Sequence, residues 1–194
     1  MPGETIPSAV MASIALRPDA EAVVEPGRRV TYRELGELVS ASTRAMLAAG
    51  VEPGDRVAIW APNGLGWIVA ALGAQSAGAA LVPINTRWKG DEAAYVLSAS
   101  KAVVLVTTVG FLGVDRVAML RAVETPLPHL RQIVLLDGPA SPPVTIAPGE
   151  VKDGVGERVV LGLPSQQTLE EGSVASLSRL NRSESRTGSP GRHQ

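Results

Sequence analysis

Apolar side chains recur at helical spacing between Thr31 and Gly50. Thr31 and Glu34 form the T-x-x-E pattern of a capping box, in which the hydroxyl and the carboxylate each bond a backbone N–H at a helix start. The positions expected to face the core are Leu35, Leu38, Val39, Ser42, Met46 and Ala49. Gly50 follows the last turn, where a left-handed residue commonly ends a helix. The pattern predicts an amphipathic helix.

Strand and helix patterns alternate after this helix. Residues 56–60 and 79–84 are apolar runs with the length of buried strands, and a helical pattern ending at residue 77 lies between them. Asn63 is expected to cap this second helix and Gly78 to end it. Helix, strand, helix and strand with short connections are typical of a parallel sheet with helical crossovers.

Similar patterns flank this region on both sides. The expected elements are a helix at 5–17, a hairpin at 22–31 that turns at Pro26-Gly27-Arg28, a short helix beginning at 89–91, a buried strand at 102–107, a weaker helix at 111–124 and a last strand at 133–136. We therefore predict an α/β fold with a mainly parallel sheet over residues 5–137.

Residues 138–194 differ in composition from the rest. Ser141-Pro142-Pro143 is typical of a linker, and residues 159–163 form a short apolar run without a periodic partner. Residues 173–194 are rich in Ser, Arg and Gly and contain no aromatic residue, so they cannot bury enough surface to offset their ordering entropy. We predict a linker followed by a disordered tail.

Composition and charge exclude several classes of function. The chain has 194 residues, a net charge of −1 and 45% hydrophobic residues, which does not favour a nucleic-acid partner. It has no cysteine, which excludes disulfides, zinc–thiolate sites and thiol nucleophiles and fits a reducing, cytoplasmic location.

The N-terminus lacks a basic region before an apolar run, so no signal peptide is indicated. Residues 65–84 could span a membrane by length, but Gly73, Gln75, Gly78 and Pro83 favour helix followed by strand, so no integral membrane segment is expected.

The ionisable residues form no recognisable catalytic group. His129 lies in a loop and His193 in the tail, and a lone loop histidine is usually solvated surface. G-x-S-x-G, H-E-x-x-H and G-x-x-x-x-G-K-[ST] are absent from the sequence. Asp55 and Asp91-Glu92 read as isolated acids in turns or helix starts, where carboxylates usually complement the helix dipole.

Gly64-Leu65-Gly66 invites comparison with a dinucleotide-binding loop. The third glycine of G-x-G-x-x-G would fall at Val69, and the strand ending at residue 84 is followed by Asn85 rather than by a carboxylate for a ribose. A nucleotide-binding Rossmann domain is therefore disfavoured.

The three tryptophans could line a binding site. Trp60 and Trp67 fall where core packing is expected, whereas Trp88 follows a strand and is ambiguous.

Several longer motifs resemble one enzyme family. These are VTYRELGELVSASTRAMLAAG, GVEPGDRVAIWAPN, AGAALVPINTRW and DEAAYVLSAS. In this order, over about residues 5–137, they resemble the N-terminal region of the adenylate-forming acyl-CoA synthetases, the AMP-dependent synthetase/ligase family. TVGFLGVDRVAML and LPHLRQIVLLDG further resemble actinobacterial fatty-acid–CoA ligases, among them the type that activates a propionate side chain on a steroid-ring remnant.

The resemblance implies activation of a carboxylic acid with ATP and Mg²⁺ to an acyl-adenylate, followed by transfer to the thiol of CoA. The family's phosphate loop, its acidic motif near the adenine, its ribose-binding aspartate and the lysine on its C-terminal lid have no matching position here. Residues 187–191 echo the phosphate loop in composition but lack its lysine. Residues 138–194 also depart from the family in composition, so we predict that the linker and tail are not part of the family domain. We therefore assign no catalytic, cofactor-binding or metal residue, and we expect ATP, Mg²⁺ and CoA to be handled by other parts of a full-length enzyme.

Two hypotheses remain. In the first, the chain is a truncated or frame-shifted N-terminal part of an acyl-CoA synthetase, inactive alone, whose partner is a complementary synthetase chain or a second copy of itself. In the alternative, it is a non-catalytic α/β interaction module that offers a sheet edge or an apolar face to a partner.

Overall fold

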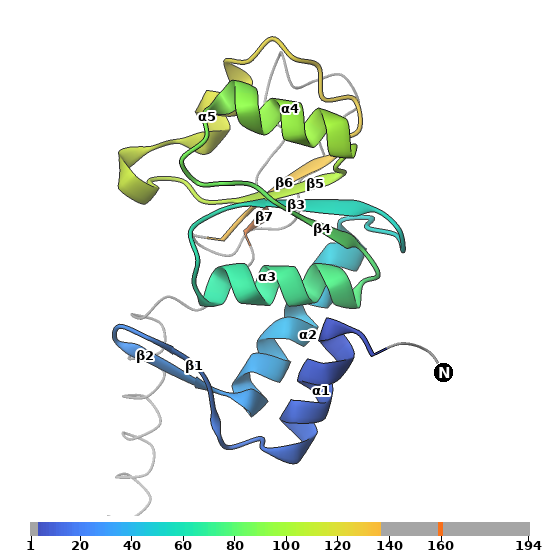
Figure 1. Cartoon of the computed structure of the whole chain (residues 1–194), viewed down its shortest axis with the longest axis vertical. Coiled ribbons are helices and arrows are strands. Elements are labelled where there is room, and N and C mark those ends of the chain that lie inside the picture. Colours follow the sequence, from blue (N-terminus) through green and yellow to red (C-terminus); the bar gives the residue numbers. More distant parts are fainter. Residues whose placement is uncertain (1–3, 137–158, 161–194) are drawn as a thin grey trace, which may run out of the picture. The chain divides into compact units, whose positions relative to one another are not determined.

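The computed structural model describes residues 4–136 and the backbone of Val159–Val160. A sheet lies between helices on both faces, beside a small separate hairpin (Figure 1). The elements are α1 (Ile6–Leu16), β1 (Glu21–Glu25), β2 (Arg28–Thr31), α2 (Tyr32–Ala48), β3 (Arg56–Trp60), α3 (Leu65–Ser76), β4 (Ala80–Pro83), α4 (Gly90–Ser100), β5 (Val104–Thr107), the 3₁₀ turn η1 (Phe111–Gly113), α5 (Arg116–Arg121), β6 (Gln132–Leu135) and β7 (Val159–Val160).

The sheet has the strand order β4-β3-β5-β6-β7 and every pair in it is parallel. α3 connects β3 to β4, and α4 lies in the connection from β4 to β5. The predicted α/β class and the parallel sheet with helical crossovers are confirmed.

Alternate residues of the central strands face opposite layers. Val57 and Ile59 of β3 belong to the apolar cluster that includes residues of α2 and α3. Ala58 and Trp60 belong to the cluster that includes residues of α4 and α5. Since successive side chains of a strand point to opposite faces, both faces of the sheet are covered, which explains the continuous apolar runs in the sequence.

The predicted capping box of α2 is confirmed. The Glu34 backbone N–H donates to Thr31 Oγ1 (3.3 Å), and the Thr31 backbone N–H donates to Glu34 Oε2 (2.7 Å). These hydrogen bonds from the Thr31 backbone and side chain lower the pKa of Glu34. Gly50, just beyond the helix, has φ = 74°, as expected for a C-terminal glycine.

The capping residue predicted for α3 is wrong. Its N-cap is Gly64, not Asn63, and no side chain of the N-cap residue bonds the helix. Instead the Leu65 backbone N–H donates to Oε1 of Glu25 at 2.7 Å. A Cβ on Gly64 would lie 2.8 Å from that oxygen, so glycine makes room for a cap from the hairpin.

β4 is an edge strand, whereas its apolar sequence predicts a buried one. The first and last residues of β4, Ala80 and Pro83, are exposed, and among the described residues the strand pairs only with β3. Proline lacks an N–H and is tolerated at an edge, so Pro83 fits this position.

The predicted helix at 111–124 is interrupted. Gly110, the residue before the 3₁₀ turn η1, and Gly113, the last residue of η1, both have positive φ, and Asp115 then caps the shorter α5 by accepting from Ala118 N. Because glycine adopts positive φ readily, these two residues allow the chain to leave the 3₁₀ turn η1 before α5 begins.

The expectation that residues 159–163 have no partner is wrong for the first two. Val159 and Val160 pair with Val134 and Leu135 of β6. The rest of the linker and tail predicted at 138–194 lies outside the described residues.

Within the described part of the chain, no helix combines the length and the apolar character required to cross a bilayer.

Candidate functional site

A cavity of about 510 Å³ lies beyond the carboxyl ends of β4 and β5. Its walls come from the loop after β4 (Thr86, Arg87, Trp88 and Lys89) and from η1 and α5. The carboxyl edge of a parallel sheet is where α/β proteins usually bind ligands. This position makes the cavity the candidate functional site.

The lining of the cavity is cationic and apolar. Arg87, Lys89 and Arg116 line it together with Trp88 and Phe111, and no Asp or Glu does. Such walls attract an anionic group attached to an apolar body.

Arg116 is almost fully buried at 2% exposure. Its guanidinium carbon lies 5.7 Å from the centroid of the Trp60 ring and 5.3 Å from that of Phe111, and Nη2 donates to the Thr86 carbonyl at 3.3 Å. Contact with two aromatic faces stabilises the buried cation. Sequence reasoning missed this residue, because an arginine next to a helix cap reads as solvated surface.

The structure separates the roles of the tryptophans. Trp60 is fully buried, as predicted, and its Nε1 donates to the Asn85 carbonyl at 3.1 Å, which ties β3 to the loop after β4. Trp67 packs half-buried against the core, also as predicted. Trp88 is 38% exposed and lines the cavity, so it is the tryptophan that can meet a ligand.

The remaining candidate residues do not assemble into a site. His129 is exposed in the turn before β6, as predicted, and His193 lies outside the described residues. Residues 4–136 contain no group of three or more His, Cys, Asp or Glu that could hold a metal ion. At the start of α3, where a dinucleotide phosphate would sit, the Glu25 carboxylate already accepts the Leu65 N–H. This carboxylate would repel a phosphate.

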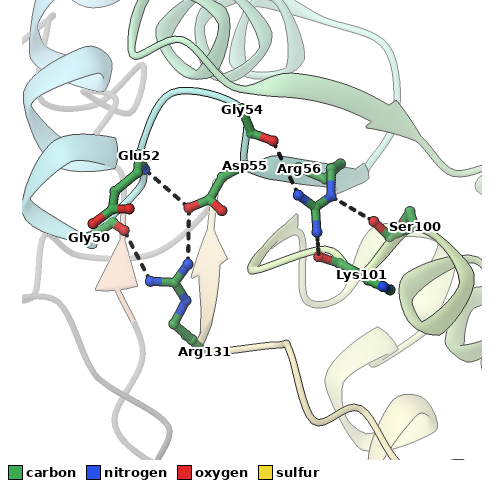
Figure 2. A network of polar contacts seen from close by, with 8 residues as sticks. All are labelled: Gly50, Glu52, Gly54, Asp55, Arg56, Ser100, Lys101 and Arg131. Carbon is green, nitrogen blue, oxygen red and sulfur yellow. Dashed lines mark hydrogen bonds and ion pairs between the residues drawn. The ribbon is translucent and has the colours of Figure 1, made fainter.

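At the amino edge of the sheet, polar contacts join distant segments (Figure 2). Arg131 Nη2 donates to Asp55 Oδ2 at 2.9 Å and Nη1 to the Gly50 carbonyl at 3.2 Å. The Glu52 backbone N–H donates to the same carboxylate oxygen at 3.1 Å. The prediction that Asp55 is isolated is therefore wrong, because it pairs with a residue 76 positions later.

Arg56 forms the second half of this network (Figure 2). Its Nε and Nη2 donate to the carbonyls of Ser100 and Lys101, both at 2.7 Å, and its Nη1 to the Gly54 carbonyl at 3.1 Å. The guanidinium thus satisfies carbonyls at the C-terminal end of α4, where Lys101 is left-handed with φ = 54°. These contacts position β3 against α4, and they lie at the sheet edge opposite the cavity.

The family model described as "AMP-binding enzyme" matches residues 11–177. The chain belongs to this family, and the resemblance to acyl-CoA synthetases is confirmed. The match extends beyond residue 137, while the domain boundary at 137/138 stays a prediction.

The curated relatives include acyl-CoA ligases. A Mycobacterium tuberculosis protein, "3-[(3aS,4S,7aS)-7a-methyl-1,5-dioxo-octahydro-1H-inden-4-yl]propanoyl:CoA ligase", is 44% identical over 130 residues, 67% of this chain and 25% of the relative. The Rhodococcus jostii protein of the same name is 43% identical over 117 residues, 60% of this chain and 23% of the relative. The chain thus spans about a quarter of the length of these relatives.

A solved structure, the N-terminal domain of FACL13 from Mycobacterium tuberculosis, is also similar. It is 27% identical with a TM-score of 0.63, covering 69% of this chain and 34% of that one. The described fold therefore corresponds to part of the N-terminal domain of an adenylate-forming enzyme.

Proposed function

We propose that this chain supplies the N-terminal part of an ATP-dependent acyl-CoA ligase, which converts a carboxylic acid, ATP and CoA into acyl-CoA, AMP and pyrophosphate. The observation that carries the proposal is the family match together with identity above 40% to two acyl-CoA ligases. Because the chain spans only a quarter of those relatives, the full reaction requires further polypeptide, and we propose that the chain alone is inactive.

We further propose the class of acid. Both relatives carry a name that specifies a propanoyl group on a fused bicyclic ring. A propionate borne by a hydrophobic fused-ring system, rather than a long linear fatty acid, is therefore the proposed substrate. ATP and CoA are intracellular, which supports a cytoplasmic location.

The cavity at the carboxyl edge has a proposed part in this reaction. Its cations Arg87, Lys89 and Arg116 surround a space without carboxylates, and all the substrates of the ligase reaction are anions. We propose that the cavity holds an anionic group of one substrate against Trp88. Binding there would be electrostatic and would weaken with salt.

Complementation in trans tests the proposal. The 194-residue chain is mixed with a ligase polypeptide from the Mycobacterium tuberculosis relative that lacks its own matching quarter. We expect no ATP–pyrophosphate exchange from either polypeptide alone and measurable exchange from the mixture. Turnover by the chain alone would refute its inactivity. A folded remainder that the chain cannot restore would refute its role as the N-terminal part.

The cavity is tested in the same mixture. Arg87→Ala should raise the KM of one substrate at least about tenfold, because a charge-assisted contact contributes roughly 1.5–3 kcal/mol. Arg121→Ala removes an exposed arginine that does not line the cavity and is the matched control. An unchanged KM for ATP, acid and CoA in the Arg87 variant would remove the cavity from the reaction.

The alternative role as a non-catalytic interaction module also has a structural observation in its favour. α1 has no buried residue and exposes Ile6, Met11 and Leu16. Only one side of α1 packs against the molecule, where Val10 is partly buried, and its exposed apolar side chains indicate a contact surface.

A further inference from the structure

A groove of about 560 Å³ runs between α1 and α2. Met11, Ile14 and Ala15 of α1 form its apolar wall, and Gly36, Glu37, Ser40 and Arg44 of α2 form the other. α1 packs closely here, since a Cβ on Gly36 would lie 3.1 Å from Ile14 Cδ1. The two helices therefore pack closely against each other, and the groove between them exposes both apolar and charged side chains.

α1 is unusual for an exposed helix. Its eleven residues, IPSAVMASIAL, include no charged side chain, and none of them is buried. Met11 is 50% exposed and Leu16 is 79% exposed. An uncharged helix with exposed large side chains and small residues between them can pack closely against another helix.

Two opposite charges on α2, Glu37 and Arg44, lie at equal distances from the midpoint between Ser40 and the next residue. Glu37 and Arg44 are seven residues apart, which is about two turns or roughly 10 Å along one side of a helix. Both are exposed and line the groove, and neither belongs to an ion pair among the described residues. Arg33, by contrast, already pairs with Asp19 at 2.9 Å. Glu37 and Arg44 are thus opposite charges on either side of a small, exposed residue.

This arrangement is self-complementary. If two copies pack with their α2 helices antiparallel about a two-fold axis that passes midway between residues 40 and 41, Glu37 of each copy faces Arg44 of the other. The same operation brings the apolar faces of the two α1 helices together, so the grooves join into the interior of a four-helix arrangement. A two-fold interface requires one surface that complements itself, and this surface does so in both charge and polarity.

We propose that the α1–α2 face is a homodimer interface, in which two Glu37–Arg44 pairs flank an apolar contact between the α1 helices. This proposal goes beyond the ligase role and does not depend on it. The dimer is tested by molecular mass and the ligase role by ATP–pyrophosphate exchange, so either proposal can fail without the other.

Charge reversal tests the interface. The full 194-residue chain is studied by sedimentation velocity and light scattering over a concentration series at low salt, where dimer is expected. Glu37→Arg places two positive charges opposite each other twice, and Arg44→Glu does the same with negative charges. Each should weaken dimerisation at least about tenfold, which is about 1.4 kcal/mol, because close charge pairs across an interface couple at least this strongly.

Mixing the two single variants is the decisive measurement. Glu37→Arg in one copy faces Arg44→Glu in the other, so the mixture should form a heterodimer although neither variant dimerises well alone. The double variant E37R/R44E should dimerise within a few-fold of the natural chain. Native mass spectrometry separates the heterodimer when one variant carries a mass tag.

Two further variants complete the design. Met11→Asp places a charge on the apolar wall of α1 and should also weaken the dimer. Arg121→Glu reverses an exposed charge on α5, which packs with the opposite face of the sheet, and should leave dimerisation unchanged. Circular dichroism melting confirms that each variant is folded.

Three outcomes would overturn the proposal. They are a natural chain that stays monomeric at the highest concentration, single variants that dimerise as tightly as the natural chain, and a mixture that yields no heterodimer. The first would mean that another segment or a ligase partner covers the groove.

Discussion

Glu25 lies in the hairpin, yet its carboxylate caps a helix that begins 40 residues later. The contact combines a hydrogen bond to the Leu65 N–H with the favourable position of a negative charge at a helix start. Glu25→Ala should therefore lower the free energy of unfolding by about 1 kcal/mol.

Urea denaturation measures this effect. Glu21→Ala is the matched control, because Glu21 pairs with Arg29 on the exposed face of the same strand and surface ion pairs contribute little. Equal losses from the two variants would show that the hairpin, rather than the cap, is responsible.

Glu34 makes stability depend on pH. Hydrogen bonds from the Thr31 backbone and side chain hold the pKa of Glu34 below its ordinary value in the folded state. The resulting stabilisation is full above the unfolded-state pKa of about 4.3 and is lost as pH falls through the lower folded-state pKa.

Glu34→Gln should therefore destabilise the protein at pH 7 and have a much smaller effect at about pH 3. Urea denaturation at both pH values measures the difference, and Glu124→Gln, at an exposed position, is the control. The same loss at both pH values would show that the effect comes from geometry rather than from charge.

Predictability at this scale depends on sequence distance. The Thr31–Glu34 box was predictable because both partners lie within one helical turn. The interpretation of Asp55 as isolated was wrong and the cap from Glu25 was missed, because their partners, Arg131 and the Leu65 N–H, are brought near only by the sheet and the hairpin. The buried Arg116 was missed for the same reason, since its two aromatic neighbours come from different segments.

Among the elements, α2 and α3 approach each other closely at Gly73 and Ser42. A Cβ on Gly73 would lie 2.2 Å from Ser42 Oγ, 2.6 Å from its Cβ and 3.0 Å from its backbone carbon. Gly73→Ala would force the helices apart and should cost about 2–3 kcal/mol.

Ser42→Ala should act in the opposite direction. The Ser42 hydroxyl is buried without a hydrogen-bond partner among the described residues, so its removal should be neutral or stabilise by up to about 1 kcal/mol. Thermal and urea denaturation check both variants. Ser42→Ala should not rescue Gly73→Ala, because the clash with the Cβ and backbone of Ser42 remains; full rescue would contradict the close helix approach.

Element types were predicted better than their environments. The apolar runs gave β3 and β5 correctly because both strands are buried on two faces. They could not show that β4 is an edge strand, since the position of a strand in a sheet depends on which other strands pair with it. Gly113, with φ = 70°, interrupts the predicted helix at 111–124, a signal that the helical spacing of its apolar residues obscured.

Across the whole molecule, the Asp55–Arg131 pair links the starts of β3 and β6 (Figure 2). The Asp55 side chain is only 17% exposed, so removal of its partner leaves a largely desolvated carboxylate. Arg131→Met should lower the free energy of unfolding by about 1–2 kcal/mol.

A double-mutant cycle with Asp55→Asn isolates the pair, and a coupling energy of at least about 0.5 kcal/mol is expected in urea denaturation. Additive losses would show that Arg131 acts mainly through its hydrogen bond to the Gly50 carbonyl.

The candidate site, like the Asp55–Arg131 pair, is formed by residues that are distant in the sequence. The sequence offered no catalytic motif, and the cavity that the structure shows is built from loops after two different strands. Arg87 and Arg116 are far apart in the sequence, and they come together because the loops that follow β4 and β5 lie at the same edge of the parallel sheet.

The strand order also determines when β3 can be protected during synthesis on the ribosome. β3 pairs with β4 on one side and with β5 on the other, so its second edge stays open until residues 104–107 have left the exit tunnel. While some fifty residues are translated, the second edge of a strand with four buried apolar residues stays unpaired. Chaperones that hold nascent chains should therefore engage this protein before β5 emerges and release it afterwards.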